Sequence, residues 1–395
     1  MSGPLDASLR VWPLAGLPEI GAGDDLAGLI ADSLRLGPGL LDGDVLVVTS
    51  KVVSKALGLR APVGVGRCDL VVSESVRIVA ERDTSTGPTR IVEAHSGVVA
   101  AAAGVDASNT GPSGEVLLLP RDPDAVTEGL HGELAGYFPG VSFAVILSDT
   151  AGRPWRGGQV DFALGACGLR VIDDHRGGRD ADGRALEVTA IAVADELAAT
   201  GDLVKGKAKK VPVALIRGAG EWVLPADEAD AASRWRDGAR RLVRTGPGDW
   251  FAMGHVEAVR AALGHPPGSA SSYAVGIPSV NRETTAARMA RAIRLALARP
   301  GTAPAGEPGA AGEPGEPGAA GTAGTAGTAG AAGTSEPGAA YVEVVVEDDG
   351  GCCAEVPVAD EFAAGYLAAR LEVALMSEGL AASVKRTPTG LRVRT

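Results

Sequence analysis

Residues 141–168 constrain the fold of this chain more than any other stretch, because an apolar run passes there directly into a dense set of polar residues. The run over 143–148 has the length and composition of a buried strand, and the Gly-Arg-Pro sequence that follows is expected to end it. Asp149 and Thr150 are therefore expected where the strand opens into a loop. In α/β proteins this is a usual position for side chains that contact a ligand.

The polar part of this stretch suits a ligand site. A carboxylate beside a hydroxyl, as at Asp149 and Thr150, matches the ligands of a hard divalent cation. Arg153 and Arg156 match phosphate or carboxylate oxygens. The alternative is an Asp-Thr pair that caps a turn at the surface. The tryptophan, glutamine and second aspartate that follow closely favour a ligand site.

Bulk properties exclude several classes of protein. The length of 395 residues allows two domains of roughly 150 residues with sizeable cores. A formal net charge of -12 argues against nonspecific binding of nucleic acid. We find no secretory leader and no run near the ~20 apolar residues of a membrane helix, so we expect no membrane contact and a soluble, cytoplasmic protein. The four cysteines lack zinc-ligand spacing, in keeping with a reducing compartment.

Two earlier segments add candidate ligand contacts. The strand expected over 44–49 ends in TSKVVSK, where Ser50 and Lys55 supply a hydroxyl and an ammonium group suited to nucleotide phosphates. This is not a Walker A loop, and a solvated strand end is the alternative. A second apolar run ends at Asp106. We pair Asp106 with Asp149 as candidate ligands of Mg²⁺ or Mn²⁺, which needs only one or two carboxylates beside phosphates. An Asx-turn at Asp106 is the alternative.

The region after the central stretch is expected to contain an acidic, glycine-rich hairpin or ligand loop, which does not match an EF-hand. A helix over 190–200 and a strand over 211–216 are expected to follow. The four lysines within 205–210 either form a solvated surface or cover a triphosphate.

The sequence changes character near residue 245. Residues 246–300 are expected to form a helical extension with two amphipathic helices. Residues 301–339 hold a Gly-x-y repeat whose second half lacks proline, which favours a flexible linker over a collagen helix. Residues 340–395 are expected to form a small β-α-β tail domain of unknown role, without a recognisable catalytic set.

Between about residues 8 and 220 the chain contains seven notable segments, in this order: GLPEI, DVLVVTSKVVSK, AAAGVDASN, SDTAGRPWRGGQVDFALGACGL, DADGRALEVT, AVADELAATGDLVKGK and VPVALIRG. Together they resemble the coenzyme F420-0:L-glutamate ligase family, including the ligase half of the fused actinobacterial enzymes. Single segments are unremarkable, but the ordered set is highly specific. The resemblance implies a catalytic domain over 8–245 with an α+β, mixed-sheet fold of two subdomains.

The resemblance implies GTP-dependent addition of L-glutamate to coenzyme F420-0, and of further γ-linked glutamates, through an acyl phosphate and with release of GDP and phosphate. It implies a divalent cation, Mg²⁺ or Mn²⁺, with K⁺ as an additional candidate, and a homodimer with small-molecule partners. Two alternatives remain: a related GTP-dependent amide ligase on another acid, and a non-catalytic paralogue that acts as a binding protein.

The family's site residues carry over position by position. The positions that match its GTP contacts are Leu17, Pro18, Glu19, Ile20, Ser50, Lys55 and Asn109. Asp106 and Asp149 match the ligands of one metal, and Thr150 matches a ligand of the second. For Arg153 and Arg156 we hypothesise a catalytic role, in which they hold the coenzyme phosphate or the glutamate carboxylates.

Two departures from the family pattern are visible. The segment between Lys55 and Glu74 is shorter than in many relatives. The fused actinobacterial enzymes continue into a flavin-binding, nitroreductase-like domain, whereas here DWFAMGHVEAVR resembles only the junction that precedes it. FMN binding is therefore not expected.

Overall fold

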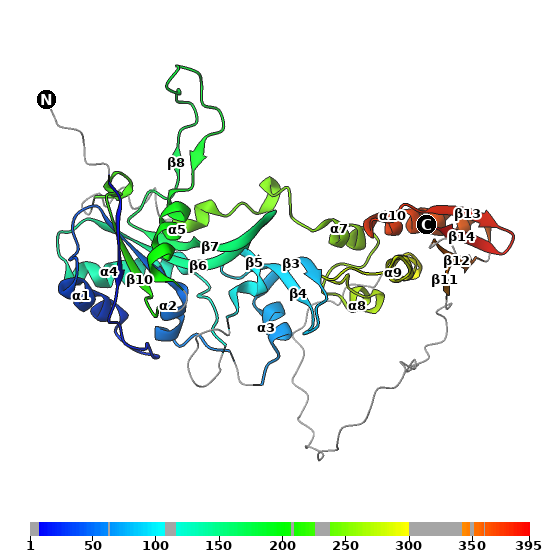
Figure 1. Cartoon of the computed structure of the whole chain (residues 1–395), viewed down its shortest axis with the longest axis horizontal. Coiled ribbons are helices and arrows are strands. Elements are labelled where there is room, and N and C mark those ends of the chain that lie inside the picture. Colours follow the sequence, from blue (N-terminus) through cyan, green and yellow to red (C-terminus); the bar gives the residue numbers. More distant parts are fainter. Residues whose placement is uncertain are drawn as a thin grey trace, which may run out of the picture. The chain divides into compact units, whose positions relative to one another are not determined.

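The computed structural model describes residues 8–61, 64–106, 116–206, 209–225, 238–299, 342–347, 351–358 and 360–395. The chain divides into two compact units, unit 1 (Met1–Gly254) and unit 2 (His255–Thr395). Both mix helices with sheets (Figure 1). No helix in the described ranges combines the length and the apolar character that crossing a membrane requires.

Unit 1 is built around a mixed five-stranded sheet. Its strand order is β1-β10-β2-β6-β7, with β2 and β6 parallel and the other neighbours antiparallel. These strands are β1 (Arg10–Leu14), β2 (Asp44–Thr49), β6 (Phe143–Arg153), β7 (Arg156–Cys167) and β10 (Val213–Arg217). The expected strand over 44–49 is thus confirmed. It is buried on both faces, as its continuous apolar run predicts.

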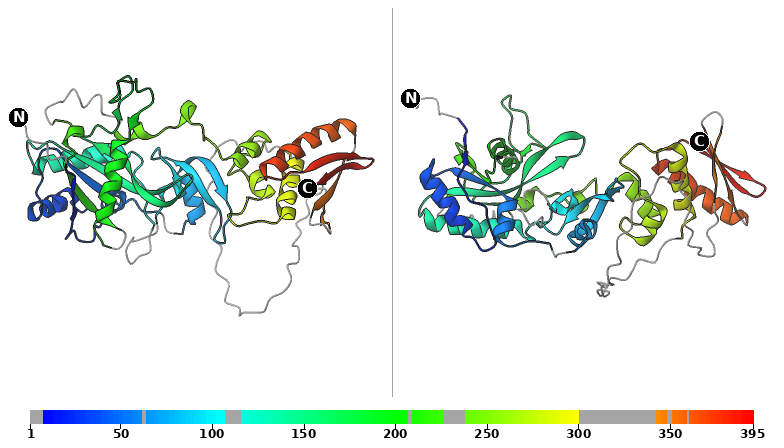
Figure 2. Two further views of the ribbon diagram at one scale, coloured as in Figure 1. Left: turned by 45° about the horizontal axis from the view of Figure 1, so that its top comes forward. Right: turned by 60° about the horizontal axis from the view of Figure 1, so that its bottom comes forward.

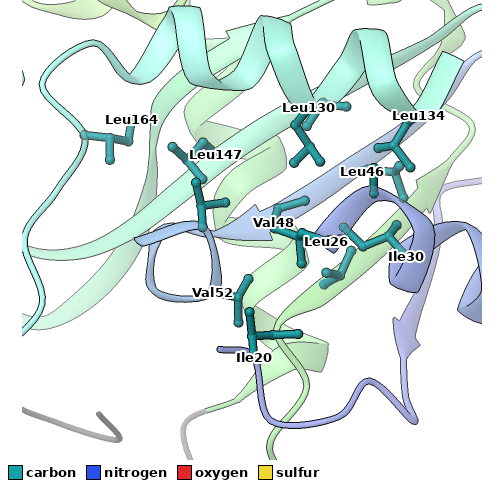
Figure 3. Packing of buried hydrophobic residues seen from close by; sticks show 14 of the residues in the cluster. Ile20, Leu26, Ile30, Leu46, Val48, Val52, Leu130, Leu134, Leu147 and Leu164 are labelled. Carbon is teal, nitrogen blue, oxygen red and sulfur yellow. The ribbon is translucent and has the colours of Figure 1, made fainter. Parts of the chain in front are cut away.

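Helices cover both faces of this sheet. The helices of the unit include α1 (Leu26–Leu36), α2 (Ser50–Ala56), α3 (Arg67–Ser73), α4 (Pro123–Tyr137) and α5 (Val193–Lys205). Leucines of α1 and α4 pack against Leu46, Val48 and Leu147 on one face (Figure 3). The intervening strand residues Val47 and Ile146 pack against α5 on the other. Figure 2 shows α5 and α1 on opposite sides of the sheet. Alternate residues of each central strand therefore serve two separate cores.

Smaller elements complete unit 1. A second, three-stranded sheet has the order β3-β4-β5. The remaining strands of unit 1 are β3 (Ser75–Arg82), β4 (Thr89–Ala94), β5 (Val99–Ala101), β8 (Asp173–Asp174) and β9 (Ala190–Ile191). The two-residue strands β8 and β9 pair at the base of the acidic loop, which projects as a hairpin (Figure 1). Of the two readings of that loop, the turn-rich hairpin is the one observed.

Two expectations for unit 1 were wrong. The central strand does not end before Asp149. It continues to Arg153, turns at Pro154 and Trp155, and returns as β7. Ladder hydrogen bonds between the two strands hold these polar residues extended, because each pairs with a residue of β7. The helix expected over 190–200 begins at Val193 and ends at Lys205. In addition, α4 was not predicted, although Asp122 and Pro123 form a standard helix start.

Unit 2 joins residues from both sides of the Gly-x-y segment in one core. Its helices include α7 (His255–Ala262), α8 (Ala270–Val275), α9 (Thr285–Leu297) and α10 (Glu361–Ser377). Its antiparallel sheet has the order β11-β12-β14-β13, with β11 (Val344–Val346), β12 (Cys352–Pro357), β13 (Ser383–Thr387) and β14 (Gly390–Arg394). Met289 and Ile293 of α9 share a hydrophobic cluster with Leu371 of α10 and Val393 of β14. The described tail thus has four strands and a helix, where a β-α-β piece was expected.

Polar contacts reinforce this core. The Arg291 guanidinium of α9 forms ion pairs with Glu283 and, after the end of α10, with Glu378. Arg370 of α10 donates to the backbone carbonyls of Ala296 and Ala298 at the end of α9. The segment 301–339, expected to be a linker, lies outside the described residues.

The packing of α5 on the sheet gives a stability prediction. A Cβ at Gly201 would lie 2.9 Å from the Cβ of Val47 and 3.0 Å from each of its Cγ atoms. Gly201→Ala is therefore expected to lower the free energy of unfolding by about 1–3 kcal/mol, despite the higher helix propensity of alanine. Gly132 of α4 is the matched control, because a Cβ there meets nothing within 4 Å. Gly132→Ala should stabilise by about 0.5–1 kcal/mol in the same denaturant titration. Equal effects of the two substitutions would contradict the close approach at Gly201.

Candidate active site

The candidate site lies where β6 passes the start of α2. Because β2 and β6 run parallel, with Thr49 opposite Ser148, the chain that leaves β2 enters α2 beside Asp149. The hydroxyl of Ser50 donates a hydrogen bond to the Asp149 carboxylate. A candidate phosphate-contacting residue and a candidate metal ligand, far apart in sequence, are thus in direct contact.

A buried network on β6, β7 and α5 lies beneath these residues. Thr150 is opposite Asp161 in the β6–β7 register, and its hydroxyl donates to Oδ1 of Asp161 over 2.7 Å. Oδ2 of Asp161 accepts from the Ser148 hydroxyl at 2.9 Å and from Nζ of Lys205 at 2.8 Å. Nζ of Lys205 also donates to Ser148 Oγ at 2.7 Å. Ser148, Asp161 and Lys205 are all at least 95% buried.

The network fixes the charge on Asp161 and the direction of the Thr150 hydroxyl. Burial raises the pKa of the Asp161 carboxyl, but the Lys205 ammonium and hydrogen bonds from Lys205, Thr150 and Ser148 together hold that pKa below its ordinary value. The single proton of the Thr150 hydroxyl points to Asp161. Its oxygen therefore meets any cation through lone pairs, which is the orientation a metal ligand needs.

Asp149 has the opposite electrostatic environment. The pKa of its carboxyl is raised to about 6, because burial and the nearby charges of Asp161 and Asp106 outweigh the hydrogen bonds from the Thr150 backbone and Ser50. A cation bound beside Asp149 would stabilise the ionised form of its carboxyl. Two carboxylates, Asp106 and Asp149, with the hydroxyl oxygen of Thr150 are donor types of a hard divalent cation, so the residues present fit Mg²⁺ or Mn²⁺.

Asp106 is held at the edge of this region. Its backbone forms two hydrogen bonds with Leu117, of 3.2 and 2.9 Å, and its carboxylate lies 2.7 Å from Nζ of Lys51. Asn109 falls outside the described residues. Over the parts of the chain that the structure describes, no group of three or more His, Cys, Asp or Glu side chains is already arranged as a metal cage. Phosphate oxygens would complete the coordination.

The loop before α1 meets the end of α2 at the same site. The Lys55 ammonium, which is 5% exposed, donates to the carboxylate of Glu19. Leu17 and Ile20 pack into the core of unit 1, while Pro18 and Glu19 remain exposed. The structure therefore brings together the 17–20 loop and α2, the two segments of the expected GTP contacts that it describes.

Arg153 and Arg156 lie elsewhere. They face each other in register at the tip of the β6–β7 hairpin, and both are exposed. Arg153 is four residues beyond Asp149, which corresponds to about 13 Å along an extended strand. Within this chain they are not in contact with the carboxylates. The polar segment that carries them is a strand end and turn, where a loop was expected.

Sequence reasoning missed the roles of Asp161 and Lys205. Lys205 was grouped with neighbouring lysines as a solvated surface or a triphosphate cover, yet it is buried on Asp161. The missed signal was helical periodicity: Leu197, Gly201 and Lys205 recur every four residues on the buried face of α5. A lysine on such a face requires a buried carboxylate partner. Of the other lysines in that group, Lys209 and Lys210 are exposed, and Lys207 is not among the described residues.

Comparisons with known proteins assign most of unit 1 to one family. The family model for F420-0:Gamma-glutamyl ligase matches residues 16–218. A coenzyme F420:L-glutamate ligase from Methanothermobacter thermautotrophicus is 42% identical over 224 residues, which cover 51% of this chain and 86% of that protein. Proteins of the same name from Methanopyrus kandleri and Halobacterium salinarum are each 39% identical, over 53% of this chain and 87% of theirs. The matched segment contains the described carboxylates, α2 and Lys205. The chain therefore belongs to the F420-0:gamma-glutamyl ligase family.

Proposed function

We propose that this protein is a GTP-dependent ligase that joins L-glutamate to coenzyme F420-0. The observation that carries the proposal is the convergence of Asp106, Asp149 and Thr150 beside α2 in a chain of this family. A carboxylate does not react with an amine directly, so the lactyl carboxylate of the coenzyme would first take the γ-phosphoryl group of GTP. The α-amine of glutamate then attacks the acyl phosphate, and an amide forms as phosphate leaves.

Different residues of the chain would bind GTP, hold the cation and orient its ligands. Ser50 and Lys55 of α2 would bind the phosphates of GTP, the hydroxyl of Ser50 and the ammonium of Lys55 exchanging their present carboxylate partners for phosphate oxygens. Asp106, Asp149 and Thr150 would hold a divalent cation, which neutralises phosphate charge during the transfer when bound. Asp161 and Lys205 orient Thr150 from below. Catalysis in such a site is mainly positioning and electrostatic stabilisation.

The direct test is a product assay. The full chain is incubated with F420-0, GTP, Mn²⁺ and L-glutamate, and the product is read by mass spectrometry. The proposal expects a mass increase of one glutamyl residue, or of several, together with GDP. Absence of any glutamylated product with each of Mg²⁺ and Mn²⁺ would overturn it. The same reaction with ATP in place of GTP tests the nucleotide assignment separately.

The role proposed for the arginines predicts that loss of Arg156 changes the KM for F420-0 or for glutamate but not the KM for GTP. Arg156→Ala is expected to raise the KM for F420-0 or for glutamate by about tenfold, because a charge-assisted contact to a phosphate or carboxylate is lost. The KM for GTP should stay within twofold, since the GTP contacts lie at α2. Arg35→Ala, which removes an exposed arginine of α1, is the control for lost surface charge. Unchanged KM values for both F420-0 and glutamate would remove Arg156 from the site.

A further inference from the structure

The tip of the β6–β7 hairpin holds a tryptophan in a conformation that tryptophan disfavours. Pro154 and Trp155 form the two-residue connection between the paired Arg153 and Arg156. Trp155 has a φ of 59°, in the left-handed region where glycine is the favoured residue. Its side chain is nevertheless 84% exposed, so burial in the core does not compensate for this strain. Strain of this kind that packing does not explain points to a function for the side chain.

The exposed ring of Trp155 contacts one aromatic ring among the residues that the structure describes. Its centroid lies 5.4 Å from that of Phe251, with the rings inclined by 68° in an edge-to-face contact. A Cβ at Gly157 or at Gly158 would meet nothing within 4 Å, so the start of β7 is also uncovered.

Phe251 rests on an anchored segment. Arg77 of β3 donates to the Ala252 carbonyl and, at 3.0 Å, to the Asp249 carboxylate. The backbone N–H of Gly254 donates to Val79 at 2.9 Å. The aromatic pair therefore joins the hairpin tip to the small sheet of unit 1, with Trp155 as its exposed member.

We propose that Trp155 is a stacking platform for the planar deazaflavin ring of F420-0, with Phe251 behind it. Arg153 and Arg156 would pair with the coenzyme's phosphodiester. The inference rests on the proposed function and deepens it. A planar, electron-poor ring attached to an anion suits an exposed indole between two guanidinium groups, because the indole stacks on the ring and the cations bind the phosphate.

The spacing along β6 agrees with the length of the coenzyme. Trp155 is five residues from Thr150, or about 16 Å along an extended strand. About ten single bonds join the deazaflavin ring to the lactyl carboxylate, through a polyol and a phosphodiester, and they span roughly 12–15 Å when extended. A ring stacked at Trp155 would thus allow the carboxylate to reach the region of Asp149 and Thr150, where phosphoryl transfer is proposed.

The test uses Trp155→Gly, a substitution that should not harm the fold. Glycine accepts the positive φ without strain, so the thermal midpoint is expected to stay equal or rise. The KM for F420-0 and its dissociation constant by calorimetry should increase at least tenfold, while the KM for GTP stays within twofold. Trp155→Phe should keep most of the affinity. Val188→Ala, which truncates an 87% exposed side chain on the β8–β9 hairpin, is the control and should change neither constant.

A fragment separates ring binding from tail binding. Phospholactate carries the anionic end of the coenzyme without the ring, and it should inhibit the wild-type chain and Trp155→Gly with the same constant. If the wild-type chain glutamylates F420-0 and Trp155→Gly has an unchanged KM for F420-0, the stacking role of Trp155 is overturned and the proposed function is not. If that variant instead dissociated a wild-type dimer and kept its KM, the tip would be a contact between copies of this chain. A wild-type chain that makes no glutamylated product would overturn the proposed function itself.

Discussion

Lys205→Met is expected to lower the free energy of unfolding of unit 1 by about 3–5 kcal/mol, the range typical for breaking a buried ion pair. Lys205 and Asp161 are both almost fully buried, and their charged atoms lie 2.8 Å apart. Methionine keeps most of the side-chain volume, so the loss comes from leaving the Asp161 carboxylate without its cation. Differential scanning calorimetry should show a fall of the transition of unit 1 by roughly 10 °C. Lys209→Met, on the exposed segment that follows, should change stability by less than about 0.5 kcal/mol.

A double variant tests the cause of this loss. Adding Asp161→Asn to Lys205→Met removes the buried charge, so part of the lost stability should return. The double variant should still bind Mn²⁺ more weakly than wild type, because an asparagine holds the Thr150 hydroxyl less firmly than a carboxylate does. A double variant as unstable as Lys205→Met would show that the charge on Asp161 is not the source of the effect.

The parts of the fold that sequence predicts here are those specified by local patterns. The strand over 44–49 is a continuous apolar run and was predicted closely, and α1 likewise has a local signal, since Asp25 caps the start of a run with helical periodicity. The β6–β7 hairpin was not, because its outer half is polar and glycine-rich and is held extended by pairing between strands. That pairing is a tertiary interaction, and the Gly-Arg-Pro sequence indicates a break when the partner strand is unknown.

The same distinction applies to the site. Asp106 and Asp149 were paired from sequence because each follows an apolar run, and the charge of Asp106 contributes to the raised pKa of Asp149. Asp161 contacts Thr150 only because the hairpin register sets them opposite, and Lys205 reaches both from α5. No local pattern encodes a network drawn from three elements. Candidate ligands are therefore easier to propose from the sequence than the residues that orient them.

Asp149→Asn is expected to abolish ligase activity and, in metal-free buffer at pH 7.5, to stabilise the protein. In the wild-type fold the pKa of the Asp149 carboxyl is raised from 3.8 to about 6, so folding favours its protonated form. The stability that comes from this preference is fully present below about pH 4 and is lost as pH rises through 6. This shift in pKa corresponds to at most about 3 kcal/mol of stability. A gain of about 1–2 kcal/mol is expected because Asp149 is partly exposed.

The pH profile and metal addition distinguish this effect from ordinary repacking. The stability advantage of Asp149→Asn over wild type in EDTA should be small at pH 4, grow up to about pH 6.5 and then level off. Mn²⁺ should raise the thermal midpoint of wild type and raise that of the variant much less, because the variant lacks a ligand. Asp174→Asn is a control of opposite sign, since hydrogen bonds from Arg176 lower the pKa of that exposed carboxyl to about 2. We propose that its surroundings destabilise the ionised Asp149 carboxylate until a cation binds. If Asp149→Asn is less stable than wild type at pH 7.5 in EDTA, that proposal is contradicted.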